Sequence, residues 1–256
     1  MVITVYAFFL DIDGTIFNGK RVSDAVIDAI KRTRQKGNKV FINTARAYMG
    51  MPEQIYTLPF DGFVNSYGLE VFADKKFIHR RFLSKELVQR VAEYGFKNNI
   101  RLYFEGEVLI TVNIESDKGF SPKSMDEFKE MLGENKVCKF VLKQPLTDEQ
   151  KNYFSDEFIF YGYEGIAKGY SKSHGIKLVA DFYDIPIENT VAMGDTNPDI
   201  DMVTFAGIGV AMGNGSEELK SAAKYITKTI DEDGVAYAID CITNGEVEKL
   251  KKIGEC

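Results

Sequence analysis

Residues Phe8–Thr15 read FFLDIDGT, and this stretch decides how the rest of the chain is interpreted. The apolar run from Ile3 to Leu10 predicts a buried strand, which ends at two carboxylates two positions apart. Alternate residues of a strand share a face, so Asp11 and Asp13 are expected at the carboxyl edge of a sheet, where open α/β folds bind ligands. Two like charges this close favour a divalent metal between them. A solvated turn after the strand is the alternative.

Composition narrows the class of protein. The chain has 256 residues, 45% of them hydrophobic, which is enough for one core plus a smaller domain. Its net charge of −6 argues against a general electrostatic grip on nucleic acid or on an anionic membrane. Three scattered cysteines without a CxxC pair predict neither a disulfide scaffold nor a structural zinc site. The N-terminal apolar run is too short to span a bilayer, and we expect a cytoplasmic protein.

The first part of the chain predicts a βαβ unit. A helix is expected from Asp24 to Lys36, with Ser23 as its N-cap, followed by a buried strand from Val40 to Ile42. Strand, helix and strand in this length favour parallel neighbours. Thr44 then falls at the same sheet edge as Asp11.

The pattern of predicted helices and strands changes near Arg80, and the earlier α/β pattern returns near Ser171. Short strands and helices in α+β style predict an inserted domain over residues 83–168, between two core segments at 1–82 and 169–256. From Ser171 onward an α/β rhythm returns. It predicts helices and strands at 176–184, 190–193, 199–205, 208–211, 217–223 and 235–242.

Polar side chains recur at the predicted edge. Thr44 offers a hydroxyl followed by backbone N–H groups that can hold phosphate oxygens, although it also fits an N-cap. Lys172 stands at a predicted helix start, where a cation is unfavourable unless an anion lies nearby. Asp195 and Asp199 are four apart and can converge on one cation such as Mg²⁺. The same segment also predicts a local helix start, with Asn197 as N-cap and Pro198 at the first helical position.

Together these residues resemble the sequence motifs of the haloacid dehalogenase superfamily. FLDIDGT (residues 9–15) is similar to its first motif, Thr44 with Arg46 to its second, Lys172 to its third, and Gly194-Asp195 with Asp199 to its fourth. The insertion, with AMGN at 211–214 and DGVA at 233–236, resembles the Cof-type (subclass IIB) sugar phosphatases. The resemblance covers nearly the whole chain. It implies a Rossmann-like three-layer core with a parallel sheet, plus a type C2 α+β cap.

The resemblance also implies a mechanism of Mg²⁺-dependent phosphate hydrolysis. Asp11 acts as nucleophile, and Asp13 as acid and base. The cap closes over the substrate and excludes water. The catalytic residues are Asp11, Asp13, Thr44 and Lys172; the phosphate-binding residues are Ile12, Thr44, Ala45, Arg46, Lys172 and Asn197; the metal ligands are Asp11, Asp13 through its carbonyl, Asp195 and Asp199.

Three positions depart from the family pattern. Pro198 and Ala45 replace the usual Asn and Gly, and Tyr67-Gly68 stands where Asn-Gly is common. Ala45 is expected to matter little, because a backbone N–H meets the phosphate there. Pro198 removes an amide and a backbone donor, which Asn197 can replace. Tyr67 is expected to narrow the rim of the site.

We expect a small phosphorylated metabolite as substrate, with a sugar phosphate at the centre of the range, and a monomer or weak homodimer. Two alternatives stay open at this point. One is a pseudoenzyme that binds a phosphometabolite without turnover, and the other is a phosphomutase. A phosphoacceptor receiver domain fits less well, because it needs neither the large insertion nor an acid role for Asp13. Most cap aromatics, including Tyr153, Phe154 and Phe158, are expected in the cap core.

Overall fold

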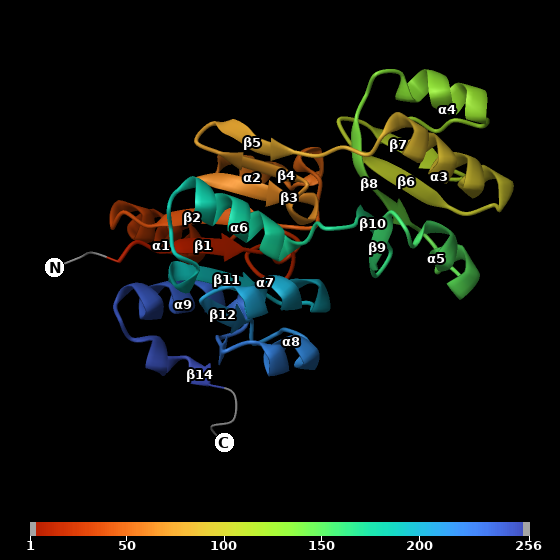
Figure 1. The fold of residues 1–256 in the computed structure, drawn as a ribbon. Helices are drawn as coiled ribbons and strands as arrows, with labels where there is room; N and C mark the ends of the chain where they lie inside the picture. The colour runs from red at the N-terminus through yellow and green to blue at the C-terminus, as the bar shows by residue number, and fades with distance from the viewer. Residues whose placement is uncertain (1–3, 253–256) are drawn as a thin grey trace. The chain divides into compact units, whose positions relative to one another are not determined.

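The structure is a computed structural model that describes residues 4–252 (Figure 1). The chain separates into two units. The first comprises residues up to 45, residues 51–79 and residues from 171 onward; the second comprises Arg46–Gly50 and Arg80–Tyr170. Ile3, where the predicted first strand begins, and Cys256 lie outside the described residues. The domain boundaries expected at 82/83 and 168/169 stay a prediction.

The first unit is an α/β layer structure around one sheet. Its elements are β1 (Ala7–Leu10), α1 (Asp24–Gln35), β2 (Lys39–Asn43), α2 (Glu53–Thr57), β3 (Gly62–Asn65), β4 (Glu70–Ala73), β5 (Lys76–Arg80), α6 (Lys172–Phe182), β11 (Thr190–Gly194), α7 (Ile200–Phe205), β12 (Ile208–Ala211), α8 (Glu217–Ala222), β13 (Tyr225–Ile226), α9 (Gly234–Thr243) and β14 (Lys251–Lys252). The strands form one sheet in the order β14-β13-β12-β11-β1-β2-β3-β4-β5.

The parallel strands place the site. β1 pairs in parallel with β2 on one side and with β11 on the other. Chain order runs outward from β1 in both directions, through β2 and β3 on one side and β11 and β12 on the other. The junction of β1 and β11 is therefore a topological switch point, where α/β sheets bind ligands beyond the carboxyl ends of their strands. The predicted βαβ unit and split α/β core are confirmed.

Helices cover both faces of this sheet (Figure 1). On one face, Phe9 and Phe41 stack with ring centroids 5.4 Å apart and belong to one buried cluster with Ile176 and Val179 of α6 and Met202 of α7. Strand residues alternate in direction, so Phe8 and Leu10 serve the opposite face, where α1 packs against α9. All four β1 residues are buried, as expected of a central parallel strand.

Serine caps set the starts of two core helices. α1 begins as predicted, with the Ser23 side chain accepting from the Val26 N–H. α6 begins at Lys172, where a helix start was expected, because Ser171 caps it by accepting from the His174 N–H. The apolar periodicity of this helix predicted it only from Ile176, because the residues of its first turn are polar.

The second unit is an antiparallel sheet with helices. Its elements are α3 (Lys85–Lys97), β6 (Leu102–Gly106), β7 (Leu109–Val112), α4 (Met125–Leu132), β8 (Val137–Leu142), α5 (Asp148–Phe154), β9 (Phe158–Tyr161) and β10 (Glu164–Ala167). The strand order is β7-β6-β8-β10-β9. Thr147 and Gln150 form a capping box at the start of α5. This α+β unit fits the expected cap.

Aromatic side chains build much of the core of the second unit. Phe140 contacts the rings of Phe104, Phe154 and Phe158 at centroid distances of 5.0 to 6.2 Å. Tyr153, also expected in this core, is half exposed and stacks on Tyr94. Within residues 4–252, no helix is both long and apolar enough to cross a membrane.

Candidate active site

The carboxyl ends of β1 and β11 bring the first and fourth predicted motifs together. Asp11 directly follows β1, and its backbone N–H donates to the Met193 carbonyl of β11 at 3.0 Å. Asp195 directly follows β11. The register of these two strands, with Leu10 opposite Met193, therefore places the first and fourth motifs side by side.

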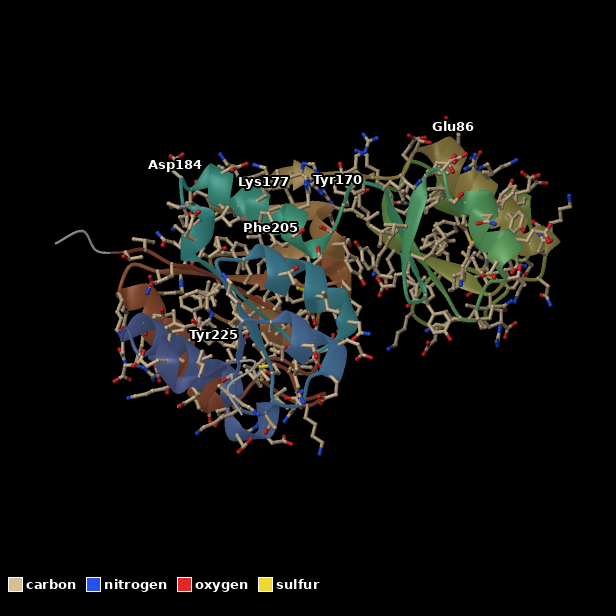
Figure 2. All side chains as sticks on the ribbon, turned by 60° about the horizontal axis from the view of Figure 1, so that its bottom comes forward. Glu86, Tyr170, Lys177, Asp184, Phe205 and Tyr225 are labelled. Carbon is tan, nitrogen blue, oxygen red and sulfur yellow. The ribbon has the colours of Figure 1, made fainter. Side chains whose placement is uncertain are left out.

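Lys172 joins this pair from the start of α6. Its ammonium group lies 2.7 Å from Oδ1 of Asp11 and 2.5 Å from Oδ1 of Asp199. All three residues are buried, with exposed fractions of 2% for Lys172, 7% for Asp11 and 0% for Asp199. By contrast, Lys177, one and a half turns further along α6, is exposed (Figure 2). The anion that the sequence required near Lys172 is thus a pair of carboxylates.

Burial controls the acid–base behaviour of the cluster. It raises the pKa of Asp11 to about 7, because burial and the neighbouring Asp199 and Asp195 together outweigh the attraction of Lys172. Burial and then Asp199 also raise the pKa of Asp195 to about 6. For Lys172, burial acts to lower the pKa, but Asp11 and Asp199 more than offset it, so its pKa lies above the ordinary value. The lysine is charged, while the acids carry an excess of unfavourable negative charge.

The two oxygens of Asp199 already have partners. Oδ2 accepts from the N–H groups of Asp195 and Thr196 and from the Thr196 hydroxyl, at 3.0 to 3.1 Å. Oδ1 accepts from Lys172. Thr196 and Asp199 form a capping box, so the expectation of Asn197 as N-cap was wrong. Asn197 is exposed, and its Oδ1 accepts from the Ser216 hydroxyl.

The loop after β1 closely approaches Asp195. A Cβ added to Gly14, whose φ is +79°, lies only 2.1 Å from Oδ2 of Asp195, so a side chain is excluded there. Thr15 donates from its hydroxyl to Oδ1 of Asp195 at 3.1 Å. Asn214 in the loop after β12 donates to the Gly14 carbonyl at 2.9 Å. Glycine at position 14 therefore allows the first and fourth motifs to meet.

The second motif follows β2. Thr44 is 1% exposed, and its N–H donates to the Val64 carbonyl. Asn43, the last residue of β2, donates from its side chain to the Lys172 carbonyl at 3.0 Å, which links this strand end to α6. Arg46 begins the short segment that belongs to the second unit, and its guanidinium donates to the Gly50 carbonyl.

Of the remaining predicted residues, Ile12 and Asp13 belong to the loop after β1 and Ala45 to the loop after β2. Ile12 is buried, and its carbonyl accepts from the N–H groups of Ile16 and Phe17. Asp13 is exposed and forms a backbone bridge with Phe17. Ala45 directly follows Thr44. The structure therefore brings Asp11, Lys172 and Asp199 into one buried cluster with the partly exposed Asp195 beside it, and leaves the Asp13 carboxyl on the surface of the described unit.

The cluster fits a divalent cation. Asp11, Asp195 and Asp199 each offer a carboxylate oxygen within 4.8 Å of the others. Lys172 contacts Asp11 and Asp199, so a single positive charge lies against a group of three carboxylates. Hard carboxylate oxygens are the ligands that Mg²⁺ prefers. The donor set and its charge thus suit such an ion.

Comparison with known proteins assigns the family. The family model of the haloacid dehalogenase-like hydrolases matches residues 8–239. The chain belongs to this family. It is 31% identical to the 5-amino-6-(5-phospho-D-ribitylamino)uracil phosphatase YcsE of Bacillus subtilis, over 90% of this chain and 92% of that protein.

Solved structures agree with the assignment. The phosphatase BT1666 from Bacteroides thetaiotaomicron has a TM-score of 0.80 and 26% identity, covering 93% of this chain and 94% of that one. The subclass IIB sugar phosphatase BT4131 has a TM-score of 0.76 and 27% identity, covering 93% and 99%. The predicted haloacid dehalogenase-like, Cof-type class, its Rossmann-like core with a cap, and its activity as a phosphoric monoester hydrolase are confirmed.

Two supporting residues of the site were missed from the sequence alone. Thr15 was noted only as part of the first motif, and nothing in the pattern indicated its bond to Asp195. Asn214 was noted only as part of the resemblance, and its bond to Gly14 spans 200 positions. A polar residue directly after a motif glycine was the one available signal, and it pointed to Thr15.

Proposed function

We propose that this protein is a Mg²⁺-dependent phosphatase that hydrolyses a small phosphorylated metabolite, a sugar or polyol phosphate, through an aspartyl-phosphate. The observation that carries the proposal is the buried contact of Lys172 with Asp11 at the switch point of the sheet. A lysine placed there neutralises a nucleophilic carboxylate before substrate binds, and can turn to the incoming phosphate when it arrives.

The groups that hold the phosphate come from four places in the chain: after β1, after β2, at the start of α6 and after β11. We assign its oxygens to the Thr44 hydroxyl, the Ala45 N–H and the Lys172 ammonium, with Ile12, Arg46 and Asn197 as further contacts. Backbone N–H groups and a lysine are suited to the three oxygens of a phosphoryl group. The occupied Oδ1 of Asn197 leaves its amide N–H₂ group as the donor for this role.

In the first step, Asp11 attacks phosphorus through a carboxylate oxygen. The P–O bond to the substrate alcohol breaks, and Asp13 gives its proton to the leaving oxygen. Asp13 is exposed in the described unit, which fits a group that must meet the substrate. The products of this step are an alcohol and an acyl phosphate on Asp11.

In the second step, Asp13, now a carboxylate, takes a proton from water as that water attacks phosphorus. The bond between phosphorus and the Asp11 oxygen breaks, which releases phosphate and restores the Asp11 carboxylate. Lys172 balances charge on the transferred group in both steps. The same two acids thus return to their starting states.

Bound Mg²⁺ supplies positive charge that offsets the charge on the phosphoryl oxygens. The residues that would hold it are Asp11, the backbone carbonyl of Asp13, and Asp195. Asp199 is expected to act through a water molecule, because its two oxygens already accept four hydrogen bonds from the protein.

The substrate class follows from relatives. YcsE acts, by its name, on a phosphorylated ribityl compound, and the subclass IIB structure is that of a sugar phosphatase. Both kinds of substrate carry the phosphate on a carbon of a polyol or sugar. We propose the same substrate class, sugar or polyol phosphates, for the present chain and name no single compound within it.

A panel of sugar, polyol, nucleoside and pyridoxal phosphates, ranked by kcat/KM with and without Mg²⁺, tests the proposal. Sugar or polyol phosphates are expected to rank highest, with turnover lost in chelator. Binding of these compounds without phosphate release contradicts hydrolysis and supports the pseudoenzyme alternative. Phosphate release that requires a second sugar as acceptor supports a mutase.

A further inference from the structure

One peptide group at the start of α6 is held at both of its polar ends by side chains from other elements. The carbonyl of Lys172 accepts from Nδ2 of Asn43, on β2, at 3.0 Å. The N–H of Ser173, in the same peptide group, donates to Oδ2 of Asp201, on α7, also at 3.0 Å. This Lys172–Ser173 peptide group is the backbone to which the lysine side chain is attached.

The side chains of Asn43 and Asp201 each keep one buried oxygen without a hydrogen-bond partner in the described chain. Asn43 is 0% exposed, and its Oδ1 has no hydrogen-bond partner among residues 4–252. Oδ1 of Asp201 is likewise buried without a partner in the described chain. A buried polar atom without a partner lowers stability, and an apolar residue of similar size would avoid that penalty. Stability therefore does not explain an asparagine at position 43, whereas its bond to the Lys172 peptide group does.

Close packing against the sheet also fixes the first turn of α6. A Cβ added to Gly175, in the first turn and a half of α6, lies 2.1 Å from Cγ1 of Val64 on β3. The glycine lets the start of α6 sit directly on the sheet. Two hydrogen bonds and one close approach thus fix the point from which the flexible lysine side chain extends.

We propose that Asn43 and Asp201 are positioning residues that act through Lys172. This inference rests on the proposed role of Lys172 in holding phosphate. Lysine has a long flexible side chain, so the position of its ammonium group depends on a fixed backbone. A displacement of about 1 Å in a reacting group can cost on the order of 10²-fold in rate.

The first variant is Asn43→Leu, which keeps the branching and the number of side-chain heavy atoms but has no donor. We expect kcat/KM to fall by about 10- to 100-fold, with a melting temperature equal to or above that of the wild type. Asn38→Leu is the matched control: Asn38 is also buried and lies at the opposite end of β2, where it bonds to Tyr6 and Thr33. It is expected to lower the melting temperature and to keep kcat/KM.

Asp201 offers a rescue test. Asp201→Asn keeps an oxygen that can accept from the Ser173 N–H, whereas Asp201→Leu removes it. We expect near wild-type kcat in the first variant and a fall in the second. Equal kcat in these two folded variants overturns the role of Asp201.

A double-mutant cycle decides whether Asn43 acts through Lys172. The affinity for inorganic phosphate is measured by calorimetry in the full-length protein with Mg²⁺, so that no turnover is needed. Asn43→Leu is expected to weaken phosphate binding in the wild type but not in Lys172→Ala, because the group that it positions is gone. Equal losses in the two backgrounds, or no loss in either, overturn the inference.

The cycle also separates this inference from the proposed function. If Lys172→Ala weakens phosphate binding and turnover while Asn43→Leu behaves as wild type, the function stands and the positioning role falls. If Lys172→Ala leaves both quantities unchanged, the phosphate-holding role of Lys172 and the inference built on it are both wrong.

Discussion

The ammonium group of Lys172 lies 2.7 Å from Oδ1 of Asp11, although the two residues are 161 positions apart in the chain. Both side chains are buried. The contact joins the first strand of the core to the first helix after the inserted unit. A cation in contact with a desolvated carboxylate at a sheet edge is an arrangement that favours a reactive nucleophile.

Asp11→Asn should abolish phosphate release. The amide has nearly the same shape but is not a nucleophile, so we expect a fall on the order of 10⁴-fold or more in kcat. p-Nitrophenyl phosphate with Mg²⁺ provides the assay, and circular dichroism confirms that the variant folds. A folded, active variant shows that another group attacks phosphorus.

Metal-free stability should depend on pH through Asp11. Its pKa is 3.8 ordinarily and about 7 in the fold, so the native state holds a proton that the unfolded chain has released. The free energy of unfolding therefore falls as pH rises from about 4 to 7, by an amount on the order of a few kcal/mol. Asp195, with its pKa raised to about 6, acts in the same direction.

Urea unfolding in chelator across this range measures the effect, and Asp11→Asn should flatten the dependence. Added Mg²⁺ is expected to raise the melting temperature most at neutral pH, where the acids are charged. A wild-type stability that increases from acid to neutral pH in chelator, with the Asp11→Asn difference constant, contradicts the assigned pKa shift.

Asp195→Asn should weaken Mg²⁺ binding. It removes one carboxylate of the three that approach within 4.8 Å, and we expect at least a 10- to 100-fold loss, by analogy with roughly that effect for residues that merely support metal ligands. Calorimetric titration with Mg²⁺ measures it. Asp184→Asn, at the exposed end of α6 in Figure 2, is the charge-matched control and should bind as wild type. Equal affinities in the two variants remove Asp195 from the metal site.

Two ion pairs of α6 should differ in their contribution to the free energy of unfolding. Asp199→Ala breaks a buried pair and leaves Lys172 and two N–H groups short of an acceptor, which is expected to cost roughly 3 to 5 kcal/mol. Asp181→Ala breaks the exposed pair with Lys177 and should cost about 0.5 kcal/mol or less. Denaturant unfolding of both variants tests the contrast, and similar losses would show that burial is not the cause.

Much of the fold was predictable because its signals are local. An apolar run bounded by turn residues gave β12 at its observed bounds, and Ser23 gave the start of α1. Apolar periodicity predicted α6 only from Ile176, because Ser171, Lys172 and Ser173 are polar, although Lys172 was expected at a helix start. Asn197 was expected as the N-cap because Pro198 follows it, whereas Thr196 occupies that position and exchanges reciprocal bonds with Asp199. The Thr-x-x-Asp spacing of a capping box was present in the sequence and was missed.

The clustering of Asp11, Asp195 and Asp199 with Lys172 was predictable from the sequence, and the hydrogen-bond partners of these residues were less so. Like charges two apart demand a counter-charge, so a cation near Asp11 followed from electrostatics. Electrostatics alone did not decide whether that cation was a metal ion or a lysine, because the answer depends on packing between β1 and α6. Asn43 shows the same limit: its bond to Lys172 spans 129 positions, and no spacing rule reaches that far.

The central claim is that Asp11 carries the phosphoryl group during turnover. Acid quenching of the enzyme during turnover of a ³²P-labelled substrate, followed by peptide mapping, tests it most directly. The account predicts an acid-stable, hydroxylamine-sensitive label on the peptide that contains Asp11, and no label in Asp11→Asn. Phosphate release without any label on that peptide, or a label that survives in Asp11→Asn, would contradict it.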